Sequence, residues 1–421
     1  MMGRKKTSLL CIFFLAGIIL GCGEKEKTEK TEIVIINGWG MMDEDHQIMR
    51  DIYEDFQENN PDITLKLISM PSSDKVIEKA KEMLSVGKVP DLIFTGGIGH
   101  ETLYRFMVEK GYALDLMPYI REDEEFEKCI SPAAFGKWET DEGKMYTISD
   151  VLLMCGYWYN EQIFQEAGIG KLPSTWEEFV ECCEQIRLWA EREKLNTVPL
   201  HLDPETSMYL VNAYMAGKTD GKSREYPLGA DKELFEEALG ELKKLEKYSE
   251  YGDYTSTYLD NMSNFNVGHT AICVNGVWAE KMLHPNLKAS YALFPTANGE
   301  EMAAVSSCLG YIVGKTGNME KQDACVKFLK YMLSEPVQAR ILKDTSQVPA
   351  SPLIDMKDYK NQCPSRLYRA IEKVNEADTF FEIPANSWTE SSLDYFKQKM
   401  YQVFTEEVSI EAFVENMEKS K

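Results

Sequence analysis

The sequence is poor in histidine and lacks several motifs on which catalysis or nucleotide binding depends. Its five histidines, at positions 46, 100, 201, 269 and 284, show no His-Glu-x-x-His pattern or other paired metal-ligand spacing. It contains no Gly-x-Ser-x-Gly and no glycine-rich phosphate loop of the P-loop or dinucleotide type. Zinc-dependent chemistry and nucleotide chemistry are therefore unsupported, and we expect neither a metal nor a cofactor.

Clustered positive charge is also missing. The 46 Lys and Arg are outnumbered by 69 Asp and Glu, for a formal net charge of -23, and no basic stripe with interleaved aromatics appears. This balance disfavours nucleic acid as a partner, because phosphate binding requires grouped cations. Hydrophobic residues make up 44% and charged residues 27% of the 421 residues, which is typical of a globular chain long enough for two or three domains.

No hydrophobic run reaches the roughly 20 residues that a membrane helix requires. The longest, Leu9 to Leu20, follows three basic residues at positions 4–6, as in an export signal. It ends in Ile-Leu-Gly-Cys, which resembles the lipobox of bacterial lipoproteins. We therefore predict a signal peptide over residues 1–21, an acylated Cys22, a solvated tether over residues 22–31, and a location on the outer face of a bacterial cell membrane.

Cysteine pairs of the Cys-x-x-Cys type are absent, although the chain has ten cysteines. Cys11 would leave with the signal peptide and Cys22 would carry lipid. We expect the remaining eight to be free, mostly buried thiols, because unpaired Cys is among the most buried residue types. One or two disulfides remain an alternative.

What is present begins with alternating strands and helices. We predict strands over Glu32 to Ile36, Ile63 to Ser69 and Pro90 to Phe94, with helices over Asp43 to Asn59 and Val76 to Leu84 between them. This βαβαβ order indicates a parallel sheet covered by helices. The turns at residues 37–40 and 95–97 would then lie at its carboxyl edge, where such sheets bind ligands.

The stretch from Phe265 to Trp278 combines a strand, a tight turn and a large aromatic residue. Thr270 to Val274 is predicted as a buried strand that Asn275-Gly276 closes. Trp278 would start the next helix and face a cleft. The alternative is a core tryptophan, which is the commoner fate of a single Trp.

The remainder of the chain gives coarser predictions. Lys144 to Tyr159 is interpreted as a crossing between lobes, and Thr175 with Glu178 as a capping box that starts a long helix. Strands are expected over Ala289 to Phe294 and Ser306 to Val313. Residues 365–420 are predicted to be wholly helical, with a break near residues 383–386. No repeat of 20 to 50 residues appears.

Two enzyme classes have to be weighed against these patterns. Ser72-Ser73-Asp74-Lys75 matches Ser-x-x-Lys and Lys315-Thr316-Gly317 matches Lys-Thr-Gly, as in penicillin-recognising acylases. Patterns this short arise often by chance, and this Ser-x-x-Lys lies in a polar stretch. Paired carboxylates of a glycosidase cannot be found by spacing, since they come from distant strands.

Large aromatic residues at the ends of predicted strands and helices favour a sugar site. Trp39, Tyr157, Trp278, Tyr311 and Trp388 all occupy such positions. Aromatic faces stack on the C–H faces of sugar rings, while carboxylate, amide and backbone groups bind the hydroxyls.

The order of short motifs over nearly the whole mature chain resembles extracellular solute-binding proteins of family 1, the lipoprotein receptors of bacterial ABC sugar importers of the maltodextrin-binding type. The motifs that carry this resemblance are Asn60-Pro61-Asp62-Ile63, Pro90-Asp91-Leu92-Ile93, Tyr159-Asn160, Ala167-Gly168-Ile169, Pro173 to Phe179, Gly268 to Ile272, Asn275-Gly276-Val277-Trp278 and Gly310-Tyr311-Ile312. The family often has a charged pair where this chain has Trp39-Gly40, and a Trp or Ser where it has Thr95.

The resemblance implies a type II periplasmic-binding-protein-like α/β fold. Two lobes of mixed sheets flanked by helices would be joined by three crossings around a ligand cleft and would close by hinge bending. The expected lobes are residues 32–150 with 308–349, and residues 151–307 with 350–421.

The resemblance also implies residue roles. Trp39, Thr95 and Gly96 would edge the cleft in the first lobe and Trp278 would be the stacking platform of the second. Asp150 would lie in the hinge, Gly310 and Tyr311 at the second crossing, and Trp388 would be a further stacking residue. Tyr157 joins this set as one of the aromatics noted above.

The function that the resemblance implies is that of a non-enzymatic, monomeric receptor. It would close on a carbohydrate, expected to be an oligosaccharide, and deliver it to the permease of an ABC importer. A lipid anchor would hold it to the membrane of that importer. The alternative is an exported hydrolase that acts on a carbohydrate or an acylated substrate.

Overall fold

The computed structural model describes residues 30–95, 101–219, 221, 231–250 and 252–420. The predicted signal peptide, the lipidation site at Cys22 and the predicted cleft residue Gly96 lie outside the described residues.

A five-stranded sheet in the order β2-β1-β3-β10-β4 forms the first lobe. Strand β1 (Thr31–Asn37) runs parallel to β2 (Ile63–Ser69) and to β3 (Leu92–Phe94), as the βαβαβ order predicted. Strand β10 (Tyr311–Val313) is antiparallel to both β3 and β4 (Thr147–Ile148). The sheet is therefore mixed, and one strand comes from much later in the chain.

Helices cover both faces of this sheet, and the apolar spacing of their sequences explains how they pack. In α1 the buried residues Met49, Ile52, Tyr53 and Phe56 form one stripe, and Phe328 of α12 meets the last two rings edge-on. The helices of this lobe are α1 (Glu44–Asn59), α2 (Ser73–Ser85), α3 (Glu101–Glu109), α4 (Met117–Arg121), α5 (Glu124–Lys128), α6 (Pro132–Trp138), α12 (Met319–Met332) and α13 (Glu335–Asp344).

The second lobe is built on a seven-stranded sheet whose main path is β12-β9-β5-β7-β6. Its central strand, β5, pairs antiparallel with β7, β8, β9 and β11, whereas β6–β7 and β9–β12 are parallel. The strands are β5 (Val151–Asn160), β6 (Val198–Leu200), β7 (Thr270–Gly276), β8 (Ala289–Ala292), β9 (Met302–Ser307), β11 (Val348–Pro349) and β12 (Thr379–Phe381).

Helix α9 lies at the centre of this lobe, with every residue from Thr206 to Gly217 buried. Helix α8 begins with the predicted capping box, in which Thr175 and Glu178 each bond the other's backbone. The helical segments of this lobe are α7 (Glu161–Glu166), α8 (Trp176–Glu193), α9 (Pro204–Lys218), α10 (Lys232–Lys243), η1 (Glu246–Tyr248), η2 (Asp253–Thr255), α11 (Tyr258–Asn266), η3 (Val277–Met282), η4 (Met356–Tyr359), α14 (Ser365–Asn375), α15 (Pro384–Ser387), α16 (Glu390–Lys399), α17 (Tyr401–Phe404) and α18 (Ile410–Lys419).

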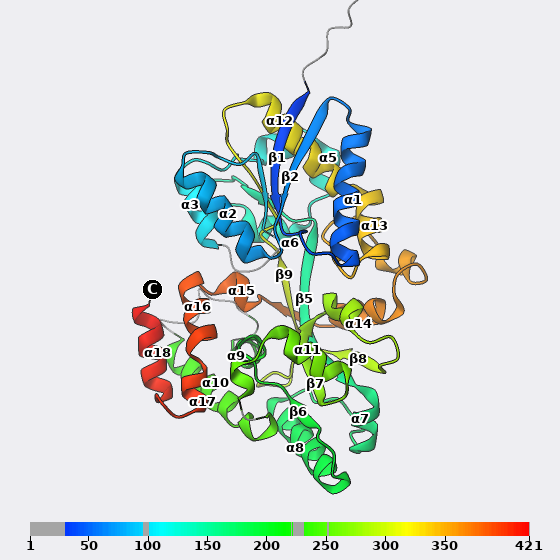
Figure 1. Ribbon diagram of the computed structural model, residues 1–421, viewed down its shortest axis with the longest axis vertical. Coiled ribbons are helices and arrows are strands. Elements are labelled where there is room, and N and C mark those ends of the chain that lie inside the picture. The colour runs from blue at the N-terminus through cyan, green and yellow to red at the C-terminus, as the bar shows by residue number, and fades with distance from the viewer. Residues whose placement is uncertain (1–29, 96–100, 220, 222–230, 251, 421) are drawn as a thin grey trace, which may run out of the picture.

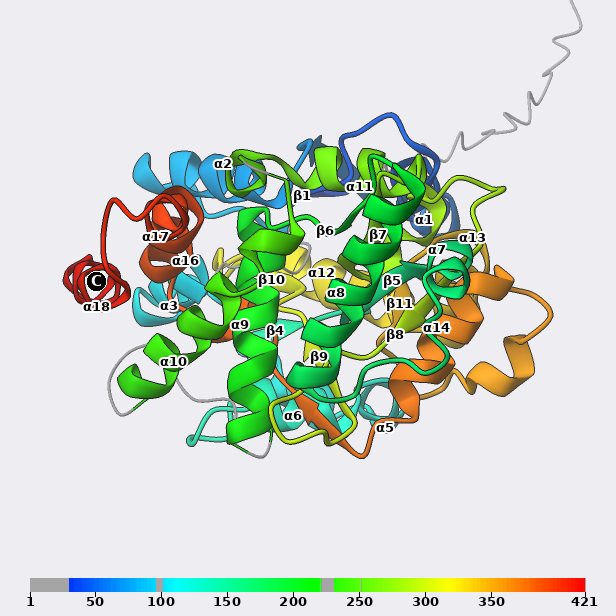
Figure 2. The same ribbon diagram turned by 90° about the horizontal axis from the view of Figure 1, so that it is seen from below.

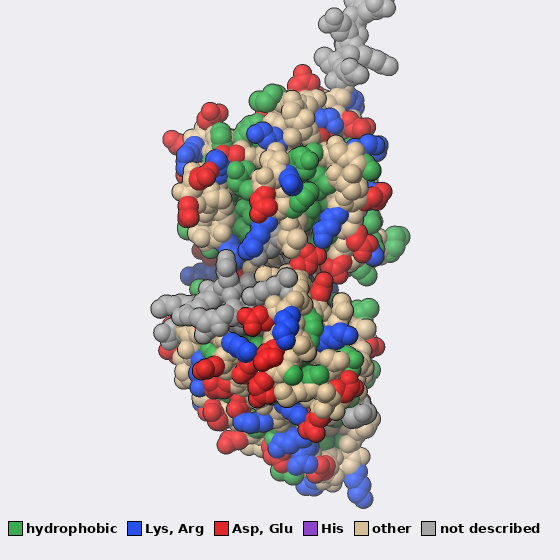
Figure 3. All heavy atoms as spheres, turned by 90° about the vertical axis from the view of Figure 1, so that its left-hand side faces the viewer, with side chains coloured by type: hydrophobic (Ala, Val, Ile, Leu, Met, Phe, Trp, Pro, Cys, Tyr) green, Lys and Arg blue, Asp and Glu red, His purple; other side chains and the backbone are tan. Residues whose placement is uncertain are grey.

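The two lobes lie one above the other along the long axis of the molecule. Figure 1 shows the paired strands β5 and β9 rising out of the lower lobe towards the upper one. Viewed from below, helices α16, α17 and α18 gather at one side of the second lobe (Figure 2). Figure 3 shows a narrower waist between the lobes, with acidic and basic side chains interspersed on the face in view.

The chain crosses between the two sheets at three places. The first crossing joins β4 to β5 at Ser149-Asp150, the second joins β9 to β10 at residues 308–310, and the third leads from α13 into β11. At the second crossing Gly310 has a φ of 61°, and a Cβ there would lie 2.3 Å from the carbonyl oxygen of Ile148. Only glycine allows the first two crossings to approach so closely.

Two predictions of secondary structure were wrong. The expected strand over Ser306 to Val313 is two strands, β9 and β10, that belong to different sheets, because the chain turns at Gly310. Residues 365–420 are not wholly helical, since β12 pairs with β9. The apolar run of β12 lies between two helical patterns and is too short to show the alternation of a strand.

The eight cysteines in the described residues are all free, which confirms the expectation of unpaired thiols. Seven are buried, and Cys363 is partly exposed.

Candidate functional site

A cavity of about 450 Å³ lies between the lobes at the carboxyl edge of the first sheet. Both lobes contribute to its walls, and its volume is within the range usual for small-molecule sites. Five aromatic rings line it, together with several polar and charged groups. Its principal lining residues are Trp39, His46, Ser72, Ser73, Asp74 and Phe94 from the first lobe, and Asp203, Glu205, Met208, Tyr209, Tyr258, Asn261, Asn275, Trp278 and Lys397 from the second.

Trp39 follows β1 and forms an aromatic wall of the first lobe. Its indole stacks on Phe94, with centroids 5.2 Å apart and planes inclined by 25°, and the His46 ring meets it edge-on. Asn37 accepts a hydrogen bond from the Trp39 backbone N–H at 2.9 Å, and the indole Nε1 donates to the hydroxyl of Tyr53 at 3.2 Å. Trp39 is 7% exposed, and its contacts with Phe94, His46 and Tyr53 fix the position of its ring.

Trp278 lies in the first turn of η3, directly after β7, and is half-buried. The turn before it is anchored from below: Tyr291 donates a hydrogen bond to the carbonyl of Asn275 at 2.9 Å, and the indole of Trp158 donates to that of Gly276 at 3.0 Å. The Trp278 ring lies directly over Gly276, where a side chain would collide with it. Trp278 therefore lines the interlobe cavity.

A buried polar cluster forms the floor of the cavity in the second lobe. Asp203 caps the start of α9 through the backbone N–H groups of Glu205 and Thr206, and it also accepts bonds from Thr206 Oγ1 at 2.7 Å and Asn261 Nδ2 at 2.9 Å. Asn261 is 3% exposed, and its Oδ1 has no hydrogen-bond partner. A buried acceptor of this kind is costly unless a donor meets it. A ligand hydroxyl could supply that donor.

The charged groups around the cavity are predominantly acidic. Among the described residues that line the cavity, Asp74, Asp203 and Glu205 face one ammonium group, that of Lys397, whose Nζ lies 3.4 Å from a Glu205 oxygen. Burial lowers the pKa of the His46 imidazole below its usual value of 6.5, against a smaller opposing effect of Asp43, so His46 is neutral at pH 7. An anionic ligand would therefore meet net negative charge.

Asp150 is the residue at which the three crossings meet. Its side chain accepts a hydrogen bond from Tyr311 of the second crossing at 2.9 Å, and its backbone carbonyl accepts one from Ala350 of the third at 3.1 Å and one from Gln338 at 2.9 Å. Burial raises the pKa of the Asp150 carboxyl to about 7, although the bond from Tyr311 opposes this shift. Asp150 thus lies at the junction of the three crossings and is not among the residues that line the cavity.

The remaining predicted site residues lie behind the cavity walls. Thr95 is buried and bonds the carbonyl of Gly310 at 3.1 Å. Tyr157 is fully buried on β5, with its ring edge against Phe179. Trp388 is 1% exposed and packs edge-on against Phe396 in the core. The structure brings Trp39 and Trp278 to the cavity, but it places Tyr157 and Trp388 in core positions, where aromatic burial is greatest.

The acylase motifs do not come together. Ser72 is the N-cap of α2 and lines the interlobe cavity, whereas Lys75 forms an exposed ion pair with Glu78. Thr316 lines a different hollow, beside Val34. The Lys-Thr-Gly segment therefore faces another region of the first lobe.

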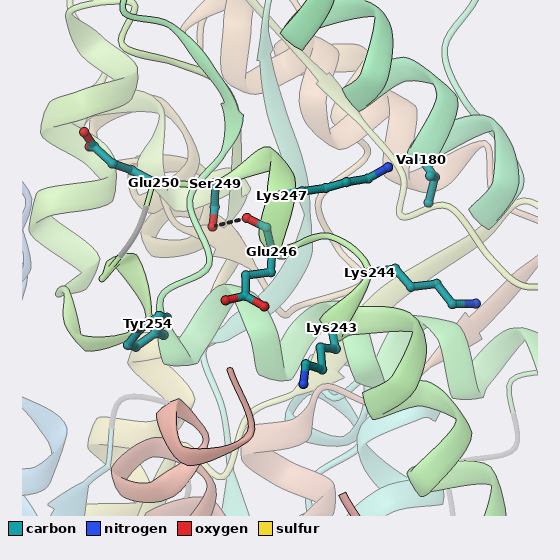
Figure 4. A pocket seen from close by; sticks show the side chains of 8 residues that line it. All are labelled: Val180, Lys243, Lys244, Glu246, Lys247, Ser249, Glu250 and Tyr254. Atoms are coloured by element: carbon teal, nitrogen blue, oxygen red, sulfur yellow. Dashed lines mark hydrogen bonds between the residues drawn. The ribbon is translucent and has the colours of Figure 1, made fainter. Parts of the chain in front are cut away.

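A second, open hollow of about 640 Å³ lies on the second lobe, around η1 and the end of α10. Figure 4 shows Lys243, Lys244 and Lys247 pointing in different directions around it. Each lysine is paired with a glutamate outside the drawn set, at 2.5 to 3.9 Å. These paired surface charges do not converge on a ligand, in contrast to the interlobe cavity.

The sequence patterns did not identify several residues that line the cavity. These are notably His46, Asp203, Glu205, Tyr258 and Asn261. Asp203-Pro204 after a short strand is a helix-start signal that could have placed Asp203 at a strand end. Tyr258 and Asn261 are spaced like any helical face, so no local pattern distinguishes them.

The comparisons with known proteins agree with this geometry. The family described as "Bacterial extracellular solute-binding protein" matches residues 51–362. The chain belongs to this family. The multiple sugar-binding protein of Streptococcus mutans is similar to this solute-binding protein, with 24% identity over 83% of this chain and 82% of the relative.

Solved structures share the two-lobed fold. A Streptococcus pneumoniae solute-binding protein in complex with the blood group A-trisaccharide has a TM-score of 0.78 at 23% identity, covering 92% of this chain and 98% of its own. The GacH receptor of Streptomyces glaucescens, studied with acarbose, has a TM-score of 0.70 at 18% identity, covering 93% and 97%. The predicted family and fold are thus confirmed.

Among the described residues, no helix is long and apolar enough to cross a membrane. Nor do those residues contain a group of three or more His, Cys, Asp or Glu side chains placed to hold a metal ion.

Proposed function

We propose that this solute-binding protein is the receptor of an ABC importer and binds a neutral oligosaccharide between its lobes without chemical turnover. The observation that carries the proposal is that each lobe contributes one tryptophan, Trp39 or Trp278, to the lining of a cavity with a hydrogen-bonding floor. Rings of this kind stack on sugars, and ligand contacts from both lobes favour the closed state.

The polar groups support a ligand rich in hydrogen-bond donors. Asn261 offers an unused acceptor, and Asn275 and Glu205 add further oxygens to the wall. The excess of carboxylates disfavours uronates, sialylated sugars and sugar phosphates. At an effective dielectric constant near 20, the repulsion between a ligand anion and one carboxylate about 6–10 Å away costs on the order of 1–3 kcal/mol. We therefore expect acidic sugars to bind at least about tenfold more weakly than their neutral counterparts.

The hydrogen bonds that the Asp203 carboxylate accepts favour binding over hydrolysis. Both of its oxygens accept hydrogen bonds from the start of α9, from Thr206 or from Asn261. A carboxylate so engaged orients a site, whereas a glycosidase needs two carboxyl groups available to the scissile bond.

Calorimetric titration with matched neutral and acidic oligosaccharides, followed by analysis of the sugars recovered, tests the proposal. We expect one neutral oligosaccharide to bind with its length unchanged after prolonged incubation. Cleavage of the bound sugar would favour the hydrolase, and failure of the whole neutral panel to bind would contradict the carbohydrate assignment.

The remaining elements of the proposal concern the cell. We infer that Cys22 carries the lipid that holds the protein at the outer face of the membrane, that the protein acts as a monomer, and that its partners are the transmembrane subunits of the permease. Metabolic labelling with a fatty acid should mark the wild type and not Cys22→Ala. Light scattering of the soluble form should give the mass of one chain.

A further inference from the structure

A line of hydrogen bonds connects the cavity wall with the hinge. The Trp39 indole Nε1 lies 3.2 Å from the Tyr53 hydroxyl, the Tyr53 and Tyr311 hydroxyls lie 2.7 Å apart, and the Tyr311 hydroxyl lies 2.9 Å from Asp150 Oδ2. The four residues come from the turn after β1, from α1, from β10 and from the β4–β5 crossing. All four are buried.

The two ends of this line fix the direction of every bond in it. An indole N–H can only donate, so Tyr53 accepts from Trp39. An ionised carboxylate can only accept, so Tyr311 donates to Asp150. The Tyr53 hydroxyl must then donate to that of Tyr311. Each hydroxyl gives one bond and receives one, and the whole line depends on an acceptor at Asp150.

We propose that Tyr53 and Tyr311 are positioning residues, which hold the Trp39 indole in the cavity wall and transmit to it the protonation state of Asp150 at the junction of the three crossings. The inference rests on the proposed function only in taking Trp39 as a ligand platform. The coupling itself exists without ligand, so it can be tested separately.

The surroundings of Asp150 make its protonation consequential. The titratable groups that interact with it are Tyr53, Tyr311 and Cys308, and burial raises the pKa of each of them, so they stay neutral at pH 7. From α13 and the third crossing it faces the neutral groups Gln338 and Ala350. No Lys, Arg or His in the described part of the chain contributes to the shift of its pKa.

Protonation changes the line in either of two ways. Asp150 Oδ1 has no hydrogen-bond partner, and a proton there leaves Oδ2 as a weaker, uncharged acceptor for Tyr311. A proton on Oδ2 would make Asp150 the donor to Tyr311 and turn the Tyr311 hydroxyl towards Tyr53, so that the Tyr53 O–H would lose its partner in the line and the Trp39 N–H would share an acceptor already used by Tyr311. Because burial raises the pKa of Asp150 to about 7, this change falls in the physiological range.

The experiment is an NMR titration of the tryptophan indole N–H signals in the full mature chain without ligand, with the Trp39 signal assigned by its loss in Trp39→Phe. We expect the wild-type Trp39 signal to shift sigmoidally with a midpoint near pH 7. Asp150→Asn keeps an oxygen acceptor but cannot titrate, and Tyr53→Phe cuts the line one bond from Trp39; both should abolish the shift.

Tyr157→Phe is the matched control, since Tyr157 is an equally buried tyrosine outside the line, and its variant should titrate like the wild type. An invariant Trp39 signal in the wild type would overturn the proposal, as would an unchanged titration in folded Asp150→Asn. Should Tyr53→Phe fail to fold, Tyr311→Phe cuts the same line at the next bond, and persistence of the shift in it would be equally decisive. No sugar is used, so failure of the sugar-binding assignment cannot produce these results.

Discussion

The substitution Gly276→Ala should weaken ligand binding while leaving the fold at least as stable. Gly276 has a φ of -78° and a ψ of 171°, which any residue adopts, so alanine meets no backbone strain. Its Cβ, however, would lie 2.1 Å from the nearest carbon of the Trp278 ring. Carbon atoms pack at about 3.5–4.0 Å, so the ring must move by roughly 1.5–2 Å.

That movement sets the size of the effect. Aromatic stacking contributes about 0.5–1.5 kcal/mol beyond simple burial, so its loss corresponds to a roughly 2- to 12-fold weaker dissociation constant. Replacing glycine at a compatible position restricts the unfolded chain and stabilises by about 0.4–1 kcal/mol, which should offset the local rearrangement of the ring. The signature is therefore weaker binding without a lower melting temperature.

The assay pairs calorimetric titration with thermal unfolding, using the neutral oligosaccharide that binds most tightly in the panel. Gly38→Ala is the matched control, because Gly38 also lines the cavity but the nearest atom to its Cβ would be 4.0 Å away. Unchanged affinity in Gly276→Ala, with Gly38→Ala equally unaffected, would show that the position of the Trp278 ring is irrelevant to the ligand.

Three other outcomes are expected. Trp278→Ala should weaken sugar binding and leave the fold intact; a large loss of melting temperature with normal binding would make it a core residue. The raised pKa of Asp150, from 3.8 to about 7, means that its contribution to stability is present below about pH 4 and lost as the pH rises to about 7, by up to about 4 kcal/mol. The free energy of unfolding of Asp150→Asn, measured relative to that of the wild type, should rise with pH over that interval. Profiles of this free energy against pH that run parallel for the two proteins would contradict this. Lys281→Ala removes a 2.7 Å ion pair with Asp45 across the lobes and should weaken binding roughly two- to fivefold, whereas Lys75→Ala, which breaks a pair within one helix, should not.

The sequence was most informative where one element follows the next with a clear period. The bounds of β2 and the start of β7 were predicted from apolar runs between turn residues, and the capping box at Thr175 located the start of α8. Such signals are local, and the structure keeps them because packing and propensity agree.

The site was predicted only in part because it is assembled from distant segments. Trp39 and Trp278 follow strands, and strand ends are recognisable. Trp388 also lies at an element boundary, yet it is buried among aromatic rings of the second lobe. Whether a boundary faces a cleft or a core depends on the neighbouring lobe, and nothing in a local stretch encodes that. Asn261 acquires its role only because α11 brings it beside Asp203.

The order in which the eight free thiols are alkylated can report how this protein unfolds. Seven of them are enclosed in the native fold, so an alkylating reagent should first reach Cys363 alone. Cys129 and Cys325 belong to the first lobe, Cys182 and Cys273 to the second, and Cys308 to the crossing between them. The order in which these sulfurs become modified under mild denaturant would therefore report which lobe loosens first, and whether the two lobes unfold as one unit or in succession.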